Sequence, residues 1–112
     1  RLNPLAEPKV SFVAQQLAKA KGPVIAATDY MKNFAGQIRT CVPGSYTVLG
    51  TDGFGRSDSR VNLRRFFEVD ANHIAAAAMV DLYKEGAVTK KDLEAALAKY
   101  DIDGTKPNPR LV

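Results

Sequence analysis

The chain has 112 residues, of which 46% are hydrophobic and 25% are charged, and its formal net charge is +4. This composition is typical of one soluble globular domain, and no apolar run is long enough for a transmembrane helix. The positive charge is mild and lacks the basic stripe with interleaved aromatic residues that nucleic-acid binding requires, so neither a membrane nor a nucleic acid is an expected partner.

The first quarter of the chain predicts an irregular lead-in, a helix and a strand. Residues 1–10 carry two prolines and should be irregular. Ser11 is a suitable N-cap for a helix that runs to about Lys19. The apolar run Val24–Ala27 follows a Gly-Pro turn signal and predicts a buried parallel strand.

A second helix and a second strand follow. Thr28 or Asp29 is expected to cap the helix, and its apolar positions recur every four residues at Tyr30, Phe34 and Ile38. After a Pro-Gly pair, residues Tyr46–Leu49 predict the second strand. Two strands joined by a helix imply a parallel crossover, and hence an α/β fold.

The second half predicts three helices and an extended tail. Ser57 or Ser59 is expected to cap the first helix, and Asp70 the second, which should end at Gly86. Thr89 with Asp92 forms a short-armed capping box before the third. The polar tail, residues 101–112, contains two prolines and should be extended.

Only two strands are predicted, which is too few for a stable sheet. We therefore expect a mostly parallel sheet flanked by helices of which this chain holds only a part. The chain also begins with Arg1 rather than Met, which fits a piece of a longer protein.

The stretch GTDGFGRSDSR, residues 50–60, is the strongest candidate for a ligand loop. Its glycines do not have the G-x-G-x-x-G spacing, and no G-K-[ST] follows. Backbone N–H groups could still bind phosphate, with Arg56 and Arg60 adding charge. We favour a structural corner in which a glycine has positive φ; if Gly55 is that residue, Gly55→Val should destabilise the chain.

Other polar residues give no catalytic pattern. The basic cluster Arg56, Arg60, Arg64 and Arg65 could grip a phosphate or an acidic partner, but it is more typical of a solvated or interface surface paired with acids. The lone His73 has no second histidine and no nucleophile pattern beside it.

Two further motifs carry no site. The sequence Asp101-Ile-Asp103-Gly104 lacks the glutamate of a calcium loop. Cys41, the single cysteine, cannot form an internal disulfide, which fits a reducing cytoplasm, and we expect it to be a small buried apolar group. No catalytic, cofactor-binding or metal-binding residue is assigned in this chain.

The strings TDYMKNFAGQIRTCVP, YTVLGTDGFGRSDSRVNLRRFFEVDANHIAAAA and NPRLV resemble the carboxyl-terminal end of the homodimeric bacterial pyruvate dehydrogenases, in the transketolase superfamily. The resemblance runs from about Pro23 to Val112, and is weaker before it. The core Phe54-Gly55-x-Ser57 is also similar to the last domain of transketolase.

This resemblance implies that residues 1–112 are the carboxyl-terminal portion of a transketolase-like C-terminal domain whose first strands lie upstream. It implies a bacterial cytoplasmic homodimer that binds thiamine diphosphate and Mg²⁺ in its other domains, decarboxylates pyruvate oxidatively and passes the acetyl group to the lipoyl group of dihydrolipoyl acetyltransferase. None of the family's cofactor or catalytic motifs maps onto this chain, so the segment alone should be inactive.

Three roles remain open at this stage. The segment could support the subunit and its dimer, it could be a regulatory module that binds a phosphate or a nucleotide at Gly50–Arg60, or it could dock an acidic or lipoyl-domain partner through its arginines.

Overall fold

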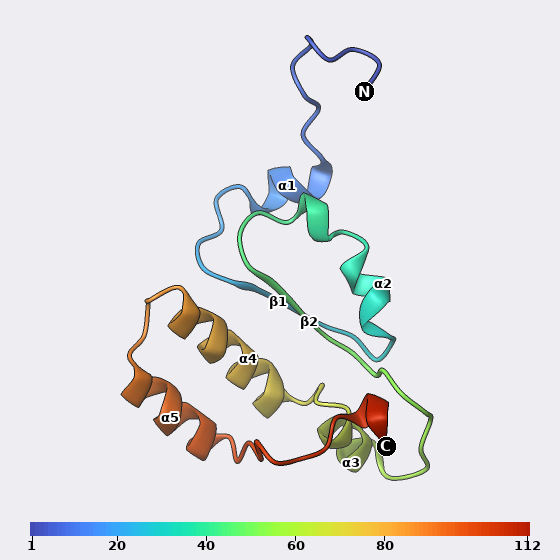
Figure 1. Ribbon diagram of the computed structural model, residues 1–112, viewed down its shortest axis with the longest axis vertical. Coiled ribbons are helices and arrows are strands. Elements are labelled where there is room, and N and C mark those ends of the chain that lie inside the picture. The colour runs from blue at the N-terminus through green and yellow to red at the C-terminus, as the bar shows by residue number, and fades with distance from the viewer.

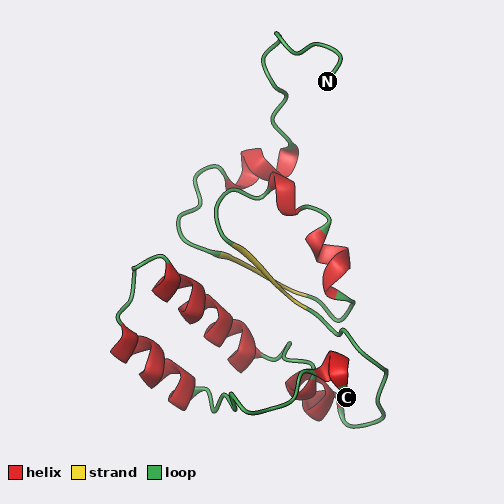
Figure 2. Ribbon diagram, in the orientation of Figure 1, coloured by secondary structure: helices red, strands yellow, loops and turns green.

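The computed structural model describes all residues from Arg1 to Val112. Figures 1 and 2 show a central strand pair with helices on both sides and an N-terminal segment that extends away from it. The elements in chain order are α1 (Phe12–Leu17), β1 (Val24–Ala27), α2 (Lys32–Gly36), η1 (Arg39–Cys41), β2 (Tyr46–Leu49), α3 (Arg60–Phe66), α4 (Ala71–Lys84), α5 (Lys90–Lys99) and η2 (Pro109–Leu111).

The sheet consists of two parallel strands, as predicted, and both have the predicted bounds. Val24 at the start of β1 is paired with Tyr46, and Ala27 at its end with Leu49. Helix α2 contacts β2, whereas α4 contacts β1 and carries α5 on its other side (Figure 1). The chain is therefore a small α/β arrangement with helices on both faces of a narrow sheet.

Local capping explains where most helices begin. Side-chain oxygens of the N-cap residues accept hydrogen bonds from backbone N–H groups three residues later, which supplies partners that the first helical turn lacks. Thr89 and Asp92 form the predicted capping box reciprocally. The other caps seen are Ser11, Ser59 and Asp70.

The second helix begins later than predicted. Thr28 N–H donates to the Leu49 carbonyl at 3.0 Å, and Thr51 N–H donates to the Tyr30 carbonyl at 2.9 Å. These bonds prolong the strand pairing beyond β1, so neither Thr28 nor Asp29 can cap a helix. Helix α2 starts at Lys32 and ends at Gly36, which leaves Ile38 outside it.

The tail is not simply extended, as the sequence suggested. Pro109–Leu111 form a 3₁₀ turn, η2, and Pro109 is buried. Lys106 Nζ lies 2.9 Å from Oε1 of Glu68, two residues after α3. Figure 1 shows the C-terminus beside α3, so the tail returns to the region that follows β2.

Little of the chain is buried. Only 7 of 112 residues are buried, and large apolar side chains such as Phe12 and Phe34 are 74% and 61% exposed. The radius of gyration is 16.9 Å, against about 13 Å for a compact domain of this length. No helix combines the length and apolar character needed to span a membrane.

Candidate functional site

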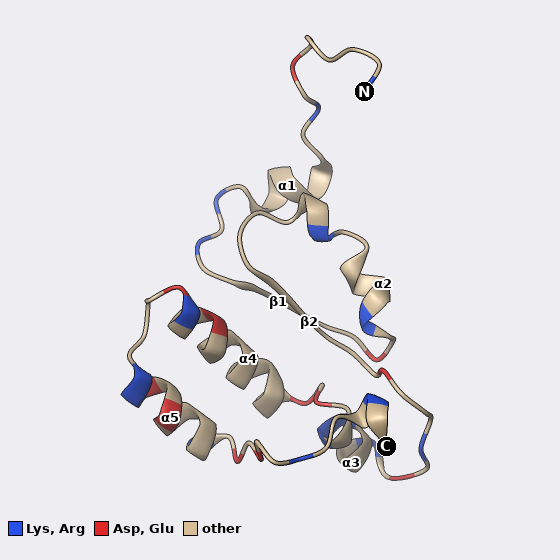
Figure 3. Cartoon of the chain, viewed as in Figure 1, with Lys and Arg blue, Asp and Glu red and all other residues tan.

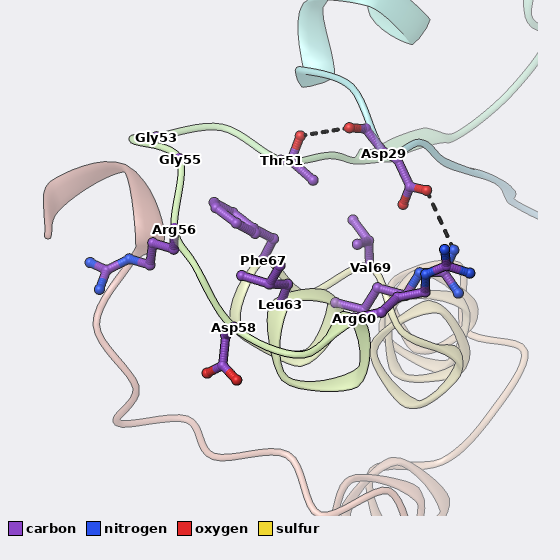
Figure 4. A pocket seen from close by; sticks show the side chains of 11 residues that line it. Asp29, Thr51, Gly53, Gly55, Arg56, Asp58, Arg60, Leu63, Phe67 and Val69 are labelled. Atoms are coloured by element: carbon purple, nitrogen blue, oxygen red, sulfur yellow. Dashed lines mark hydrogen bonds and ion pairs between the residues drawn. The ribbon is translucent and has the colours of Figure 1, made fainter.

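The loop after β2, residues 50–59, lies at the carboxyl edge of the strand pair. Asp29 and Thr51 each stand two residues beyond the end of a strand. Thr51 Oγ1 donates a hydrogen bond of 2.9 Å to the Asp29 carbonyl, which ties the two strand ends together (Figure 4). In open parallel sheets this edge is where ligands bind, which makes the loop the candidate site of this chain.

An open hollow of about 620 Å³ lies beside this loop. It is lined by residues of the loop, of the segment after β1, and of α3 with the residues that follow it. Its apolar wall consists of Leu63, Phe67 and Val69. Figure 4 shows these side chains below the glycine loop and the Thr51–Asp29 pair. The rest of the lining is polar or glycine, and it includes both arginine and aspartate side chains.

Two glycines set the path of the loop. A Cβ on Gly50 would lie 2.6 Å from the Tyr30 carbonyl oxygen, so only glycine lets the two strand ends approach this closely. Gly53 has φ +115° and a Cβ there would lie 2.5 Å from the Pro109 carbonyl oxygen. Gly55 has neither a positive φ nor a close neighbour. The condition attached to Gly55 is therefore not met, and Gly53 fills the role of the corner glycine.

The predicted basic cluster is divided between different surroundings. Arg56 lies over the Phe66 ring, 4.2 Å from its centroid. Arg65 pairs with Asp101 at 2.7 Å, and Arg64 pairs with Asp29 at 3.4 Å. Arg60 lines the hollow without an ion pair or a side-chain hydrogen bond in the protein. Two of the four arginines thus have acidic partners, and of the two without one, only Arg56 has an aromatic ring against its guanidinium.

Asp58, one of the two acidic residues that line the hollow, is held by hydrogen bonds from its neighbours. Asp58 Oδ1 accepts hydrogen bonds from Asn62 Nδ2 at 2.9 Å and from Ser59 N–H at 2.6 Å. These bonds lower the pKa of Asp58 below its usual value. Figure 4 shows the Asp58 and Arg56 side chains pointing away from the apolar wall. The charged side chains nearer to the apolar wall are those of Asp29, Arg60 and Arg64.

His73 and Asp70 form a pair at the start of α4. Asp70 Oδ1 accepts a hydrogen bond from the His73 backbone N–H at 2.9 Å and lies 2.6 Å from Nδ1 of the ring. Burial raises the pKa of Asp70, but the hydrogen bonds from His73 and the charges of His73 and Arg65 outweigh it and leave the pKa lowered. The pair fixes the helix start, and no nucleophile completes a catalytic arrangement.

No cluster of three or more His, Cys, Asp or Glu side chains is placed to hold a metal ion. Asp103, in the rejected calcium-like motif, instead accepts hydrogen bonds from the backbone and hydroxyl of Thr105. Cys41 is a free thiol of intermediate exposure, so it is less buried than expected.

Sequence reasoning missed one buried polar contact. Asp81 in α4 is only 4% exposed, and its carboxylate accepts a 2.5 Å hydrogen bond from Thr47 Oγ1 of β2. Lys84 Nζ lies 3.8 Å from the same carboxylate. The acidic residue within an otherwise apolar part of α4 was the available signal, but only the packing of α4 beside the strands identifies its partner.

The class of protein to which this fold belongs is given by its match to a known family. Residues 2–70 match the family described as the transketolase-like TK C-terminal domain, more than half of the chain, and the chain therefore belongs to that family. This confirms the predicted fold class of a partial α/β domain of that kind.

Comparison with individual proteins shows which members of this family the chain is similar to. The chain is 55% identical over 111 residues to the pyruvate dehydrogenase E1 component of Escherichia coli, which covers 98% of this chain and 12% of that protein. It is 52% identical to the protein of the same name from Cupriavidus necator, over 99% of this chain and 12% of that protein. For Pseudomonas aeruginosa the identity is 54%, over 97% of this chain and 12% of that protein.

These relatives are much longer than the chain, which spans about 12% of their length. The chain is homologous to the C-terminal region of pyruvate dehydrogenase E1 components. The resemblance seen in the sequence is thereby confirmed.

Proposed function

We propose that this chain is a structural segment of a pyruvate dehydrogenase E1 component and that it supports its own subunit and a homodimer. The observation that carries the proposal is 55% identity across 98% of the chain. In this proposal the whole enzyme decarboxylates pyruvate oxidatively with thiamine diphosphate and transfers the acetyl group to the lipoyl group of dihydrolipoyl acetyltransferase.

The surface of the chain supports a packing role. Its accessible area is 8533 Å², whereas a complete folded protein of 12.1 kDa exposes about 6,000 Å². The excess of about 2,500 Å² is comparable to a large protein interface. We propose that residues 1–112 are the carboxyl-terminal portion of one domain, and that upstream strands and the partner subunit cover this surface.

The residues of this chain do not fit thiamine diphosphate with Mg²⁺. They offer no cluster of metal-binding side chains, and the loop after β2 lacks the lysine of a phosphate-binding P-loop. We therefore assign the cofactor to the rest of the subunit and derive no step of the reaction from residues of this chain.

The proposal is tested on the complete subunit. Purified with thiamine diphosphate and Mg²⁺, it should reduce an artificial electron acceptor in the presence of pyruvate, and light scattering should give the mass of a dimer. A folded subunit that binds the cofactor but shows no turnover with pyruvate contradicts the proposed reaction.

A shortened subunit tests the structural role separately. Deletion of these 112 residues should reduce dimerisation and thermal stability, because apolar surfaces that pack against the segment become exposed. A shortened subunit with the dimer mass and melting temperature of the complete one would contradict the supporting role while leaving the reaction intact.

A further inference from the structure

We propose that the hollow beside α3 is a binding site for a small organic anion, in which Arg60 holds a carboxylate or phosphate group and the apolar wall holds a compact hydrophobic part. This goes beyond the proposed function, which assigns no ligand to the residues of this chain.

The position of the hollow is the first argument. It opens where β1 and β2 both end, between Asp29 and the loop that contains Thr51. Side chains beyond the carboxyl ends of neighbouring parallel strands converge on one edge, and ligands of open α/β sheets bind there. The volume of about 620 Å³ is in the range of small-molecule sites.

The charges are the second argument. Arg64 is paired with Asp29 at 3.4 Å, and Asp58 accepts hydrogen bonds from Asn62 and Ser59. Arg60 is exposed and has no partner, although it lines the hollow one helical turn before Arg64. The lining therefore holds three arginines against two aspartates, and Arg60 is the arginine there with neither an ion pair nor an aromatic ring against its guanidinium, a planar fork that matches carboxylate or phosphate oxygens.

The wall is the third argument. Leu63, Phe67 and Val69 form an apolar surface beside that charge, and Figure 4 shows the Phe67 side chain directed into the space below the loop. A small inorganic anion would leave this surface in water. A ligand with a short apolar or aromatic group next to its anionic head would use both features.

The loop that closes the hollow is held in place by the rest of the chain. Asp52 binds the backbone N–H of Lys32 at 2.8 Å, and Gly53 lies against Pro109 of the tail. A site whose rim is fixed before binding loses less entropy when the ligand arrives.

Calorimetry on the complete subunit, saturated with thiamine diphosphate and Mg²⁺ so that the cofactor's own anion site is filled, tests the proposal. The probes are phenyl phosphate, benzoate, inorganic phosphate and benzyl alcohol. Phenyl phosphate or benzoate should bind, and the tighter of the two identifies the preferred head group. Inorganic phosphate and benzyl alcohol should each bind at least about tenfold more weakly, because each lacks one of the two features.

Variants locate the site. Arg60→Gln should weaken binding of the better probe about tenfold or more, because a charge-assisted hydrogen bond is lost. Arg60→Lys should weaken it less, since it keeps the charge but not the fork. Arg1→Gln, which removes the same charge from the distant N-terminal segment (Figure 3), should leave binding unchanged.

The proposal is overturned if neither organic anion binds, or if Arg60→Gln binds as tightly as the unchanged protein. Equal losses in Arg60→Gln and Arg1→Gln would show a general charge effect and also overturn it. Inorganic phosphate that binds as well as phenyl phosphate would indicate an adventitious ion only and would likewise overturn the proposal. None of these outcomes bears on turnover of pyruvate, so failure here and failure of the proposed reaction are distinguishable.

Discussion

The carboxylate of Asp52 accepts a 2.8 Å hydrogen bond from the backbone N–H of Lys32, a residue 20 positions earlier in the chain. Lys32 is the first residue of α2, and its N-cap residue, Met31, makes no side-chain capping bond. The loop after β2 therefore supplies the partner that the start of α2 lacks, and this bond joins the two loops that follow the strands.

Replacement of Asp52 by alanine should loosen both loops. The Lys32 amide loses its partner, so its hydrogen exchange should accelerate, and the free energy of unfolding should fall by about 1 kcal/mol. Glu7→Ala removes an exposed acid from the irregular lead-in and is the control, with no change expected. Unaltered exchange of the Lys32 amide in Asp52→Ala would show that this bond does not hold the helix start.

The distance along the chain between a cap and its partner explains which helix starts could be predicted from the sequence. Ser11, Asp70 and Thr89 cap helices through residues three positions later, so a short window of sequence contains the whole interaction. Asp52 caps across 20 residues, and a local pattern cannot contain that contact. The predicted N-cap at Thr28 or Asp29 was wrong because equally remote backbone bonds, from Thr28 to Leu49 and from Thr51 to Tyr30, prolong the strand pairing there.

A pair of glycine substitutions tests the corner. Gly53→Ala should destabilise the chain by about 1–3 kcal/mol, because alanine at positive φ is strained and its Cβ would meet the Pro109 carbonyl oxygen at 2.5 Å. Gly55→Ala is the matched control in the same loop, with no positive φ and no atom within 4 Å of the added Cβ. The denaturation midpoint should fall for Gly53→Ala and stay nearly constant for Gly55→Ala.

Amide exchange shows where Gly53→Ala acts. Protection should be lost in residues 106–112, because the tail has to move away from the loop. A larger loss of stability in Gly55→Ala than in Gly53→Ala would contradict the assignment of the corner to Gly53.

The pH dependence of stability should include a contribution from Asp70. Its pKa is lowered in the folded chain. At pH values between the pKa of the folded state and that of the unfolded state, the unfolded state therefore binds more protons. The contribution is fully present above the pKa of the unfolded state and is lost as the pH falls through the folded value.

The variant Asp70→Asn isolates the contribution of the Asp70 charge to the free energy of unfolding. Asparagine keeps an acceptor for the His73 backbone N–H but carries no charge. The difference in unfolding free energy between the unchanged protein and Asp70→Asn should therefore shrink as the pH is lowered, as measured by denaturant titration at several pH values. A difference that is constant with pH would exclude the proposed ionisation.

The candidate site was only partly visible in the sequence. The position of residues 50–60 after a predicted strand placed the loop correctly, and the arginines at 56, 60, 64 and 65 were noticed as one group. Their separation into paired and free side chains depends on Asp29 and Asp101, which lie 35 and 36 residues away from their partners. Only the packed chain reveals that Arg60 is left without a partner.

Thr47 and the buried Asp81 should be energetically coupled. Thr47→Val removes the 2.5 Å donor while the carboxylate remains 4% exposed, and a buried charge without this bond costs about 1–3 kcal/mol. Ser45→Ala is the control with a weaker contact, since Ser45 Oγ lies 3.5 Å from the same carboxylate, and it should cost less.

A double-mutant cycle measures the coupling directly. Thr47→Val combined with Asp81→Leu should destabilise by less than the sum of the single changes, because the apolar pair leaves no charge to satisfy. Strict additivity of the two effects in denaturant titrations would show that the side chains do not interact in solution.

The outer edges of the strand pair lead to the last prediction. β1 and β2 pair only with each other, so the backbone N–H and C=O groups on their outer sides have no strand partner within this chain. The 112-residue chain alone should therefore self-associate or exchange its strand amides quickly, whereas in the complete subunit the same amides should be protected by further strands. Light scattering after size-exclusion chromatography and amide exchange on both proteins make the comparison. A compact monomer with slowly exchanging amides at Val24–Ala27 and Tyr46–Leu49 would show that the two strands are stable without neighbours, and the proposal of upstream strands would then have no basis.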